Sequence, residues 1–228
     1  MMMKTVAALL ALAMLFGCCS ALAEDAPQGN KILFQGHGSL RVTTAEGKVI
    51  YIDPYAGDGY DVPADLILVT HGHPDHNAVN LIKTKNPDCV TITYQEALVN
   101  GEYKVFDLDF VKVEAVQAGN NPNHDINVCV GFVLTFTDGK TLYVTGDTST
   151  TDQMAELAER KLDYAFFCCD GRFNMNAEEA SACAGLVGAR FSIPYHMAPG
   201  ALFSADVADA FQAEGKLIVA AGEEFVME

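Results

Sequence analysis

The sequence predicts a single layered α/β (α+β) domain in which helices cover β-sheets. Short β-prone runs dominate the first half of the chain, and strands alternate with helices in the second half. No repeat, low-complexity linker or change in composition marks a domain boundary. The 228 residues suffice for one sizeable domain, and the 50% of apolar residues excludes an intrinsically disordered acidic chain.

The first half of the folded region is predicted to consist mainly of strands. Leu66–Thr70 is a continuous apolar run, which is typical of a strand buried on both faces. Asn77–Lys85 is a candidate short helix that ends before Pro87. The other predicted strands are Lys31–Gln35, Ser39–Thr44, Val49–Ile52, Val90–Thr93 and two within Tyr103–Val116.

The second half begins with a predicted hairpin. Val128–Thr137 and Thr141–Thr145 flank Asp138-Gly139, a pair that favours a type I′ turn. Helices and strands then alternate. The predicted helices are Thr151–Lys161, Asn176–Gly188 and Ser204–Glu214, and the predicted strands are Asp163–Cys169, Phe191–Tyr195 and Leu217–Val219.

Residues 1–23 are predicted to be a signal segment, which leaves residues 24–228 as the domain. Lys4 precedes an apolar run, and small residues then lead into an acidic stretch. Two cleavage points compete: one after Ala23, and one in a lipobox-like Leu15-Phe16-Gly17-Cys18 that would leave Cys18 lipid-modified. Either alternative predicts a protein exported across the bacterial cytoplasmic membrane, attached to a membrane only through a lipid at Cys18.

The charge of the chain limits its partners. Thirty acidic residues against 14 basic ones give a formal net charge of −16, which argues against binding nucleic acid through its phosphates. The expected partner is a small-molecule substrate, and the oligomeric state stays open. The cysteines beyond the signal segment are expected to be buried apolar residues, because they are odd in number and include no C-x-x-C pair.

A cluster of metal-ligand side chains follows the buried strand Leu66–Thr70. The segment Thr70-His71-Gly72-His73-Pro74-Asp75-His76 places four such groups within six positions. Gly72 and Pro74 impose an irregular backbone, so the side chains can converge on one point. Imidazole nitrogen and carboxylate oxygen suit zinc, and also manganese or iron.

Three more side chains of this type lie beside predicted strands. His124 lies in the Gly- and Asn-rich segment 119–127, Asp147 follows one strand in Thr145-Gly146-Asp147-Thr148, and His196 follows another in Pro194-Tyr195-His196. Each is weak evidence alone. Together they matter, because open sheets place their sites at the carboxyl ends of strands.

The order H-x-H-x-D-H, then His, then Gly-Asp-Thr, then His resembles the metallo-β-lactamase-fold hydrolase superfamily. Gly36-His37-Gly38-Ser39 and Ile52-Asp53-Pro54 are most similar to its branch that contains L-ascorbate-6-phosphate lactonase and uncharacterised metal-dependent hydrolases. The resemblance implies a four-layer αββα sandwich and a dinuclear metal site. His71, His73 and His124 would hold the first ion, Asp75, His76 and His196 the second, and Asp147 would bridge both.

Further roles follow from position. Asp75, Asp147 and His196 are expected to act in catalysis. Asp53 is the candidate to orient a histidine of the main motif, the alternative being a turn-capping role before Pro54. His37 and Arg172 are candidate substrate contacts, although a surface turn histidine and a solvated arginine are the alternatives.

We therefore expect a metal-dependent hydrolase that cleaves a small ester, lactone or phosphoester. Two divalent ions, with zinc as the expected metal, would lower the pKa of a bridging water, and the resulting hydroxide would attack the substrate. Two alternatives remain open: a β-lactamase that acts on antibiotics, and an exported protein that binds metal or captures substrate with little catalysis.

Overall fold

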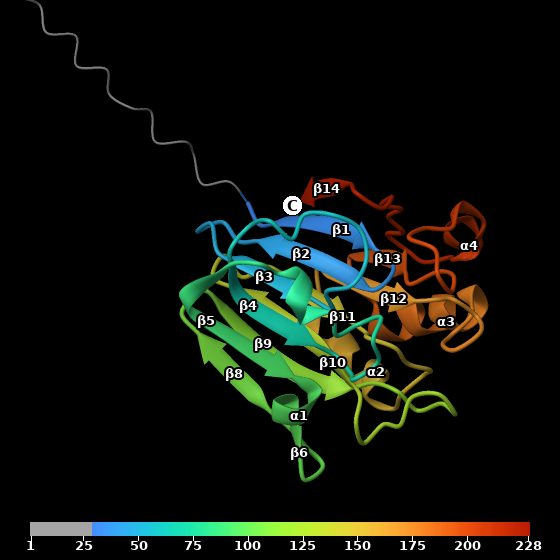
Figure 1. The fold of residues 1–228 in the computed structure, drawn as a ribbon. Coiled ribbons are helices and arrows are strands. Elements are labelled where there is room, and N and C mark those ends of the chain that lie inside the picture. Colours follow the sequence, from blue (N-terminus) through green and yellow to red (C-terminus); the bar gives the residue numbers. More distant parts are fainter. Residues whose placement is uncertain (1–28) are drawn as a thin grey trace, which may run out of the picture.

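The computed structural model describes residues 29–228, which form two six-stranded mixed sheets packed face to face (Figure 1). The predicted signal segment lies outside the described residues. The first sheet contains, in spatial order, β14 (Glu224–Val226), β1 (Lys31–Gly36), β2 (Ser39–Thr43), β3 (Val49–Ile52), β4 (Ala64–Val69) and β5 (Lys85–Thr93). The second contains β13 (Phe191–Tyr195), β12 (Tyr164–Cys168), β11 (Thr141–Val144), β10 (Val130–Phe136), β9 (Val111–Gln117) and β8 (Val105–Leu108).

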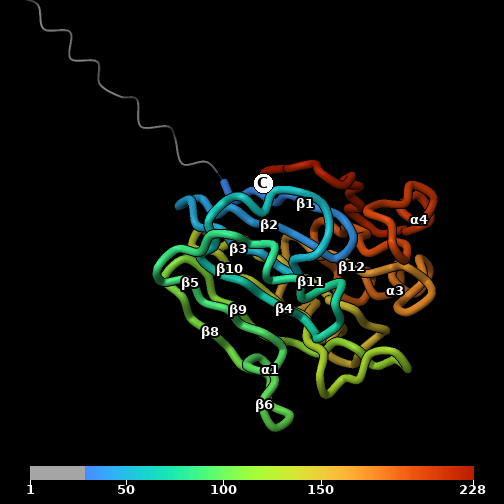
Figure 2. Tube along the Cα trace, in the orientation of Figure 1, coloured from blue at the N-terminus to red at the C-terminus, as the bar shows by residue number. Residues whose placement is uncertain are grey.

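Each sheet has a parallel half and an antiparallel half. The strands β3, β4 and β5 run parallel, as do β11, β12 and β13, and the other pairs are antiparallel. The C-terminal end lies beside the first strand of the described residues, because β14 pairs with β1 (Figure 2). The parallel halves matter for function, because their carboxyl ends all face one edge of the sandwich.

The main core lies between the two sheets. Alternate residues of the strands point into it, as the rings of Phe34 on β1 and Phe166 on β12 do with centroids 6.5 Å apart. On β4, Leu66 and Leu68 join this core, whereas Ile67 and Val69 pack on the opposite face of the sheet. Both faces of β4 are therefore buried, which explains its continuous apolar run.

The outer face of each sheet is covered differently. Against the second sheet lie α2 (Gln153–Glu156), η2 (Leu157–Arg160), α3 (Ala177–Val187) and α4 (Ala205–Ala210). The outer face of the first sheet packs against Tyr60, Val62 and η1 (Val79–Leu81), a single 3₁₀ turn. The predicted arrangement of two sheets between helical layers is present, but one helical layer is reduced to a loop and this turn.

Several elements differ from the prediction. The predicted helix Asn77–Lys85 is only η1, because that segment buries no helical face that could stabilise more turns. The predicted helix Thr151–Lys161 changes from α2 to η2 and ends where Lys161 adopts φ +50°. The predicted helix Ser204–Glu214 is helical only in α4. The predicted strand Leu217–Val219 does not form, because this part of the chain makes a single bridge to β13, at Lys216, before it leaves the sheet.

The turn between β10 and β11 also corrects the prediction. A type I′ turn needs positive φ at both central residues, but only Gly139 has it, at +85°. Gly139 N–H donates to the Phe136 carbonyl, so the hairpin uses a longer loop that ends on this left-handed glycine. Four further elements were not predicted from the sequence: β14, the helix α1 (Tyr94–Ala97), and the strands β6 (Leu98–Val99) and β7 (Glu102–Tyr103) of a small hairpin.

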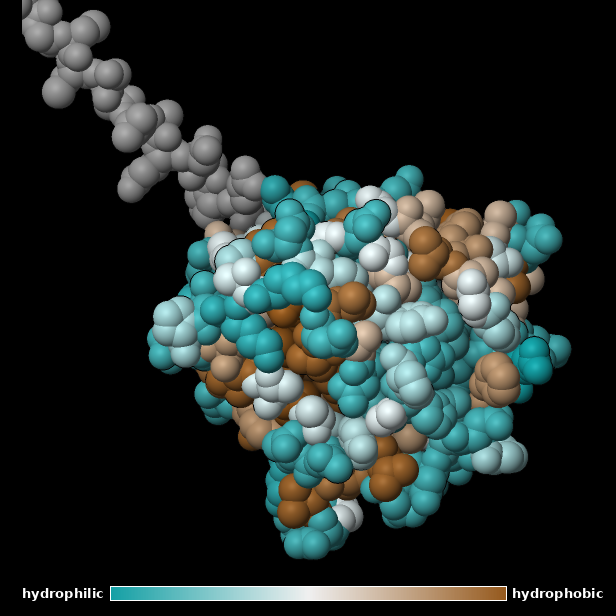
Figure 3. All heavy atoms as spheres, viewed as in Figure 1, coloured by the Kyte–Doolittle hydropathy of each residue, from teal (hydrophilic) through white to brown (hydrophobic). Residues whose placement is uncertain are grey.

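The surface of the described residues is mixed. On the face shown in Figure 3, hydrophobic side chains lie in small groups between hydrophilic ones. None of the helices formed by residues 29–228 is long and apolar enough to cross a membrane.

Candidate metal centre

The predicted ligands gather at the edge of the sandwich where the parallel strands end. The positions beyond β3, β4, β11, β12 and β13 meet there, together with the loop between β9 and β10. The ligand-type residues that these segments bring to the edge are His71, His73, Asp75, His76, His124, Asp147 and His196.

A first group contains only histidines. Its ligand nitrogens lie within 4.8 Å of one another and belong to His71, His73 and His124. The Thr70 hydroxyl donates to Asp53 and lies 3.1 Å from His71 Nδ1, so it accepts from that nitrogen. Asn121 Oδ1 lies 3.2 Å from His124 Nδ1 and also accepts. Both imidazoles therefore carry their proton on Nδ1 and keep a lone pair on Nε2.

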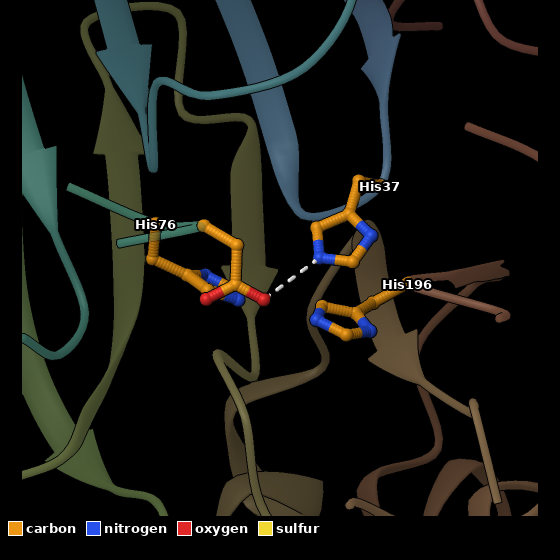
Figure 4. Close-up of side chains that lie close together, drawn as sticks. His37, His76 and His196 are labelled. Carbon is orange, nitrogen blue, oxygen red and sulfur yellow. Dashed lines mark hydrogen bonds and ion pairs between the residues drawn. The ribbon is translucent and has the colours of Figure 1, made fainter. Parts of the chain in front are cut away.

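A second group contains a carboxylate. The ligand atoms of His37, Asp75, His76 and His196 lie within 4.8 Å of one another. Figure 4 shows the ring of His37 over that of His196. The two ring centroids are 3.8 Å apart, and Nε2 of His37 lies 3.3 Å from Oδ2 of Asp75. His76 Nδ1 donates to Asp53 Oδ2 at 2.8 Å, which leaves Nε2 of His76 free.

Asp147 lies between the two groups. Its carboxylate oxygens are 3.3 Å from Nε2 of His76, 3.3 Å from Nε2 of His124 and 3.4 Å from Nε2 of His196. Burial acts to raise its pKa, but the neighbouring histidines outweigh burial and hold the pKa of Asp147 well below its ordinary value. This carboxylate is thus ionised and within reach of histidines from both groups.

The donor set fits divalent cations. Within residues 29–228, the buried atoms that lack a hydrogen-bond partner include Nε2 of His71, His76, His124 and His196, and Oδ1 of Asp147. Burial lowers the pKa of His71 to about 2, so this imidazole is neutral and can act as a ligand. Desolvated lone pairs that face one another without partners are costly, whereas nitrogen and carboxylate ligands around a divalent ion are favourable.

Asp53 supports the site from behind. Although the residue has φ +47°, its carboxylate accepts hydrogen bonds from the Thr70 amide at 2.7 Å and the Thr70 hydroxyl at 2.6 Å, and from His76. Burial would lower the pKa of His76, but the carboxylates of Asp147 and Asp53 raise it well above the ordinary value. The structure therefore places Asp53 against a motif histidine.

Two residues of this centre were not predicted from the sequence. Asp170, just beyond β12, has a fully buried side chain whose Oδ2 lies 3.3 Å from His196 Nδ1. The Asn174 amide donates to Asp170 at 2.7 Å and to Asp147 at 2.8 Å. The rule that placed Asp147 and His196, a polar residue at the carboxyl end of a parallel strand, also applies to Asp170. No comparable signal marks Asn174.

The two candidate substrate contacts differ in position. His37 is buried at 3% exposure and has an unpartnered Nδ1, so it is not a surface turn residue. Arg172 is exposed, and its guanidinium stacks on the ring of Phe173 at 4.9 Å.

Two of the cavities beside the centre are lined by its ligand-type residues or by His37. One, of about 330 Å³, is lined by His73, Asp75, Asn123, His124, Asp147, Phe173 and His196. The other, of about 300 Å³, is lined by His37, Tyr55, Ala56, Gly200, Ala201 and Leu202. Both are at the small end of ligand-binding sites, and neither is lined by Lys or Arg.

The family follows from comparison with known proteins. Residues 31–196 match the family model described as the beta-lactamase superfamily domain. This chain belongs to the metallo-β-lactamase superfamily. It is 32% identical over 194 residues to the UPF0173 metal-dependent hydrolase of Geobacillus sp. (strain WCH70), an alignment that covers 73% of this chain and 84% of the relative.

Solved structures agree with this assignment. A protein from Parabacteroides distasonis assigned as a metal-dependent hydrolase matches with a TM-score of 0.69 and 27% identity over 84% of this chain and 93% of its own. A protein from Thermotoga maritima assigned as a Zn-dependent hydrolase of the metallo-β-lactamase superfamily matches with a TM-score of 0.59 and 19% identity over 83% and 97% of the two chains. The predicted fold is confirmed, and the chain is a metal-dependent hydrolase of the metallo-β-lactamase fold.

Proposed function

We propose that this hydrolase uses two divalent ions, zinc by preference, to cleave a small ester or lactone. The observation that carries the proposal is the set of unpartnered Nε2 atoms that surround the Asp147 carboxylate at the floor of a cavity. The Zn-dependent assignment of the T. maritima protein supports the choice of metal. The motifs shared with the lactonase branch support the choice of substrate.

The contacts of each residue indicate which metal position it would belong to. His71, His73 and His124 would hold one ion, Asp75, His76 and His196 the other, and Asp147 would contact both. Ions held there would act as Lewis acids toward a substrate oxygen and would lower the pKa of a water molecule toward neutrality. Asp53 fixes the ring of His76, and His37 holds the Asp75 carboxylate in place.

The cavity walls support a carbonyl substrate over a phosphoester. Phe173, Tyr55 and Leu202 provide apolar surface, and no Lys or Arg lines either cavity. Anionic phosphate groups are normally bound by such cations. Arg172 beside Phe173 is the nearby candidate for an anionic group, so the Arg172→Gln variant tests whether the substrate carries one.

The test begins with metal analysis of the purified protein after loading with zinc, manganese or iron. A panel of lactones, carboxylic esters, phosphoesters and a chromogenic cephalosporin is then assayed with the His73→Ala variant as the blank. Two ions per chain and chelator-sensitive hydrolysis of lactones or esters are expected. Hydrolysis of the cephalosporin alone would indicate a β-lactamase, and two bound ions without any hydrolysis would indicate a binding protein.

We further propose that the protein is exported, on the strength of the predicted signal segment 1–23. Fractionation of cells that express the full chain tests this proposal. Membrane attachment that is lost in the Cys18→Ser variant supports a lipid anchor, whereas a soluble product that begins at Glu24 supports cleavage after Ala23. Retention of the whole chain in the cytoplasm contradicts export.

A further inference from the structure

We propose that the two metal positions are unequal, and that the position formed by Asp75, His76 and His196 binds a divalent ion first and more tightly. The inference rests on the two-ion site of the proposed function. It follows from the groups that stand behind the histidines, which are carboxylates in one position and neutral oxygens in the other.

Carboxylates support the second position. His76 Nδ1 donates to the fully buried Asp53 at 2.8 Å, and His196 Nδ1 faces the fully buried Asp170 at 3.3 Å. A carboxylate behind an imidazole fixes its orientation and makes its other nitrogen a stronger donor to metal. This position also includes Asp75, an anionic ligand of its own.

Neutral groups support the first position. His71 Nδ1 contacts the hydroxyl of Thr70, and His124 Nδ1 contacts the amide oxygen of Asn121. A hydroxyl and an amide orient the rings but add little negative charge. The third histidine, His73, is exposed, so its side chain is less fixed. Asp53 also lies within 4.8 Å of His71, but the Thr70 hydroxyl stands between the two, and Asp147 is shared with the other position.

Asp170 is held rigidly in its supporting role. One of its oxygens accepts from the backbone amides of Arg172 and Phe173, both at 2.7 Å, and the other accepts from the Asn174 side chain at 2.7 Å. The same Asn174 nitrogen donates to Asp147 at 2.8 Å. Asn174 therefore bonds both to Asp170, which lies behind His196, and to Asp147, which lies between the two metal positions. It is a positioning residue for both metal positions.

Metal titration tests the inequality. Metal-free protein is titrated with Zn²⁺ and with Co²⁺ against a competing chelator, and the Co²⁺ absorption spectrum is recorded at each step. Replacement of a carboxylate behind a metal-binding histidine typically costs 10–100-fold in affinity. We therefore expect Asp170→Asn to weaken the tighter step by about 10–100-fold and to leave the weaker step within about threefold. Asn121→Ala should weaken the other step only, and Asn174→Ala should weaken both.

Asp163→Asn is the control, because Asp163 is a half-buried carboxylate that also accepts hydrogen bonds, but from Thr141 at the opposite end of β11. Both binding steps should stay at the wild-type values in this variant. Should Asp170→Asn fail to fold, the wild-type protein still decides the question. In crystals grown with one equivalent of Zn²⁺, anomalous scattering between His76 and His196 supports the proposal.

Anomalous scattering at His71, His73 and His124 would overturn it, as would an Asp170→Asn variant that weakens only the looser step or neither step. These outcomes are separate from the hydrolysis assays. A protein that hydrolyses esters but fills the positions in the opposite order refutes only the inequality, and one that fills them in the proposed order without hydrolysis refutes only the function.

Discussion

The Gly38→Ala substitution tests whether metal binding and activity depend on the close packing of Gly38 against His76. Gly38 has no positive φ, so its backbone accepts alanine. The new Cβ, however, would lie 2.6 Å from His76 Cε1 and 3.1 Å from its Nδ1. Ordinary contacts begin at 3.4 Å, so the imidazole or the β1–β2 turn must move by about 0.8 Å. His76 is fully buried and bonded to Asp53, so it cannot swing away freely.

We expect this change to cost about 1–3 kcal/mol of folding stability, as overpacking usually does. A shift near 1 Å in a catalytic group can lower activity by about 100-fold, which corresponds to about 2.7 kcal/mol of transition-state stabilisation. The assays are kcat/KM on the substrate found by the panel, metal content per chain, and thermal unfolding.

The control is Gly185→Ala in α3, where the added Cβ meets nothing within 4 Å and the backbone is right-handed. This variant should keep full activity and gain about 0.5–1 kcal/mol in stability. If Gly38→Ala retained kcat/KM and metal content within about threefold of the wild type, the argument from spacing would be refuted.

Three further predictions concern stability. The pKa of Asp65 is held below its ordinary value because hydrogen bonds from the Val49 amide, Lys48 and Asn86 outweigh burial. The ionised Asp65 carboxylate therefore contributes to folding stability above about pH 4. This contribution is lost as the pH falls through the lowered pKa that Asp65 has in the folded protein. Urea titrations should show that Asp65→Asn is less stable at pH 7 and loses less stability on acidification; an unchanged acid profile contradicts this. Chelation should lower Tm, since ions at about 100 times their Kd contribute about 2.7 kcal/mol, and calorimetry with and without chelator measures it. Phe166→Ala should lose about 3–5 kcal/mol in denaturant titrations, because this fully buried ring packs against Phe34 from the opposite sheet.

Most of the site could be predicted because its signal is local. His71, His73, Asp75 and His76 follow one buried strand within six positions, so a single segment already specifies a cluster. The sequence predicts less strongly those site residues that come from distant segments of the chain. Asp147 and His196 could be included only because strand ends share an edge and because the order of motifs resembles a known superfamily.

Helix lengths could not be predicted, because they depend on tertiary contacts. Asn77–Lys85 has the composition of a short helix, yet the first sheet needs only one turn there, since Tyr60 and Val62 cover part of the same face. In contrast, α3 was predicted to within one residue at each end. Its ends carry their own signals: the Asn176 side chain accepts from the Glu179 amide, and Gly188 ends the helix in the left-handed conformation.

The need for bound cations becomes visible only when the folded chain brings acidic groups together. Asp53, Asp147 and Asp170 are far apart in sequence, and each alone reads as a turn residue or a weak ligand candidate. In the fold their side chains are at most 4% exposed, and the ion-pair partners found for them within residues 29–228 are all histidines. No Lys or Arg of this region balances their charge, although buried carboxylates are costly without a counter-charge. Histidines that serve as metal ligands are neutral, so in the working site divalent ions must supply the positive charge that keeps these carboxylates buried.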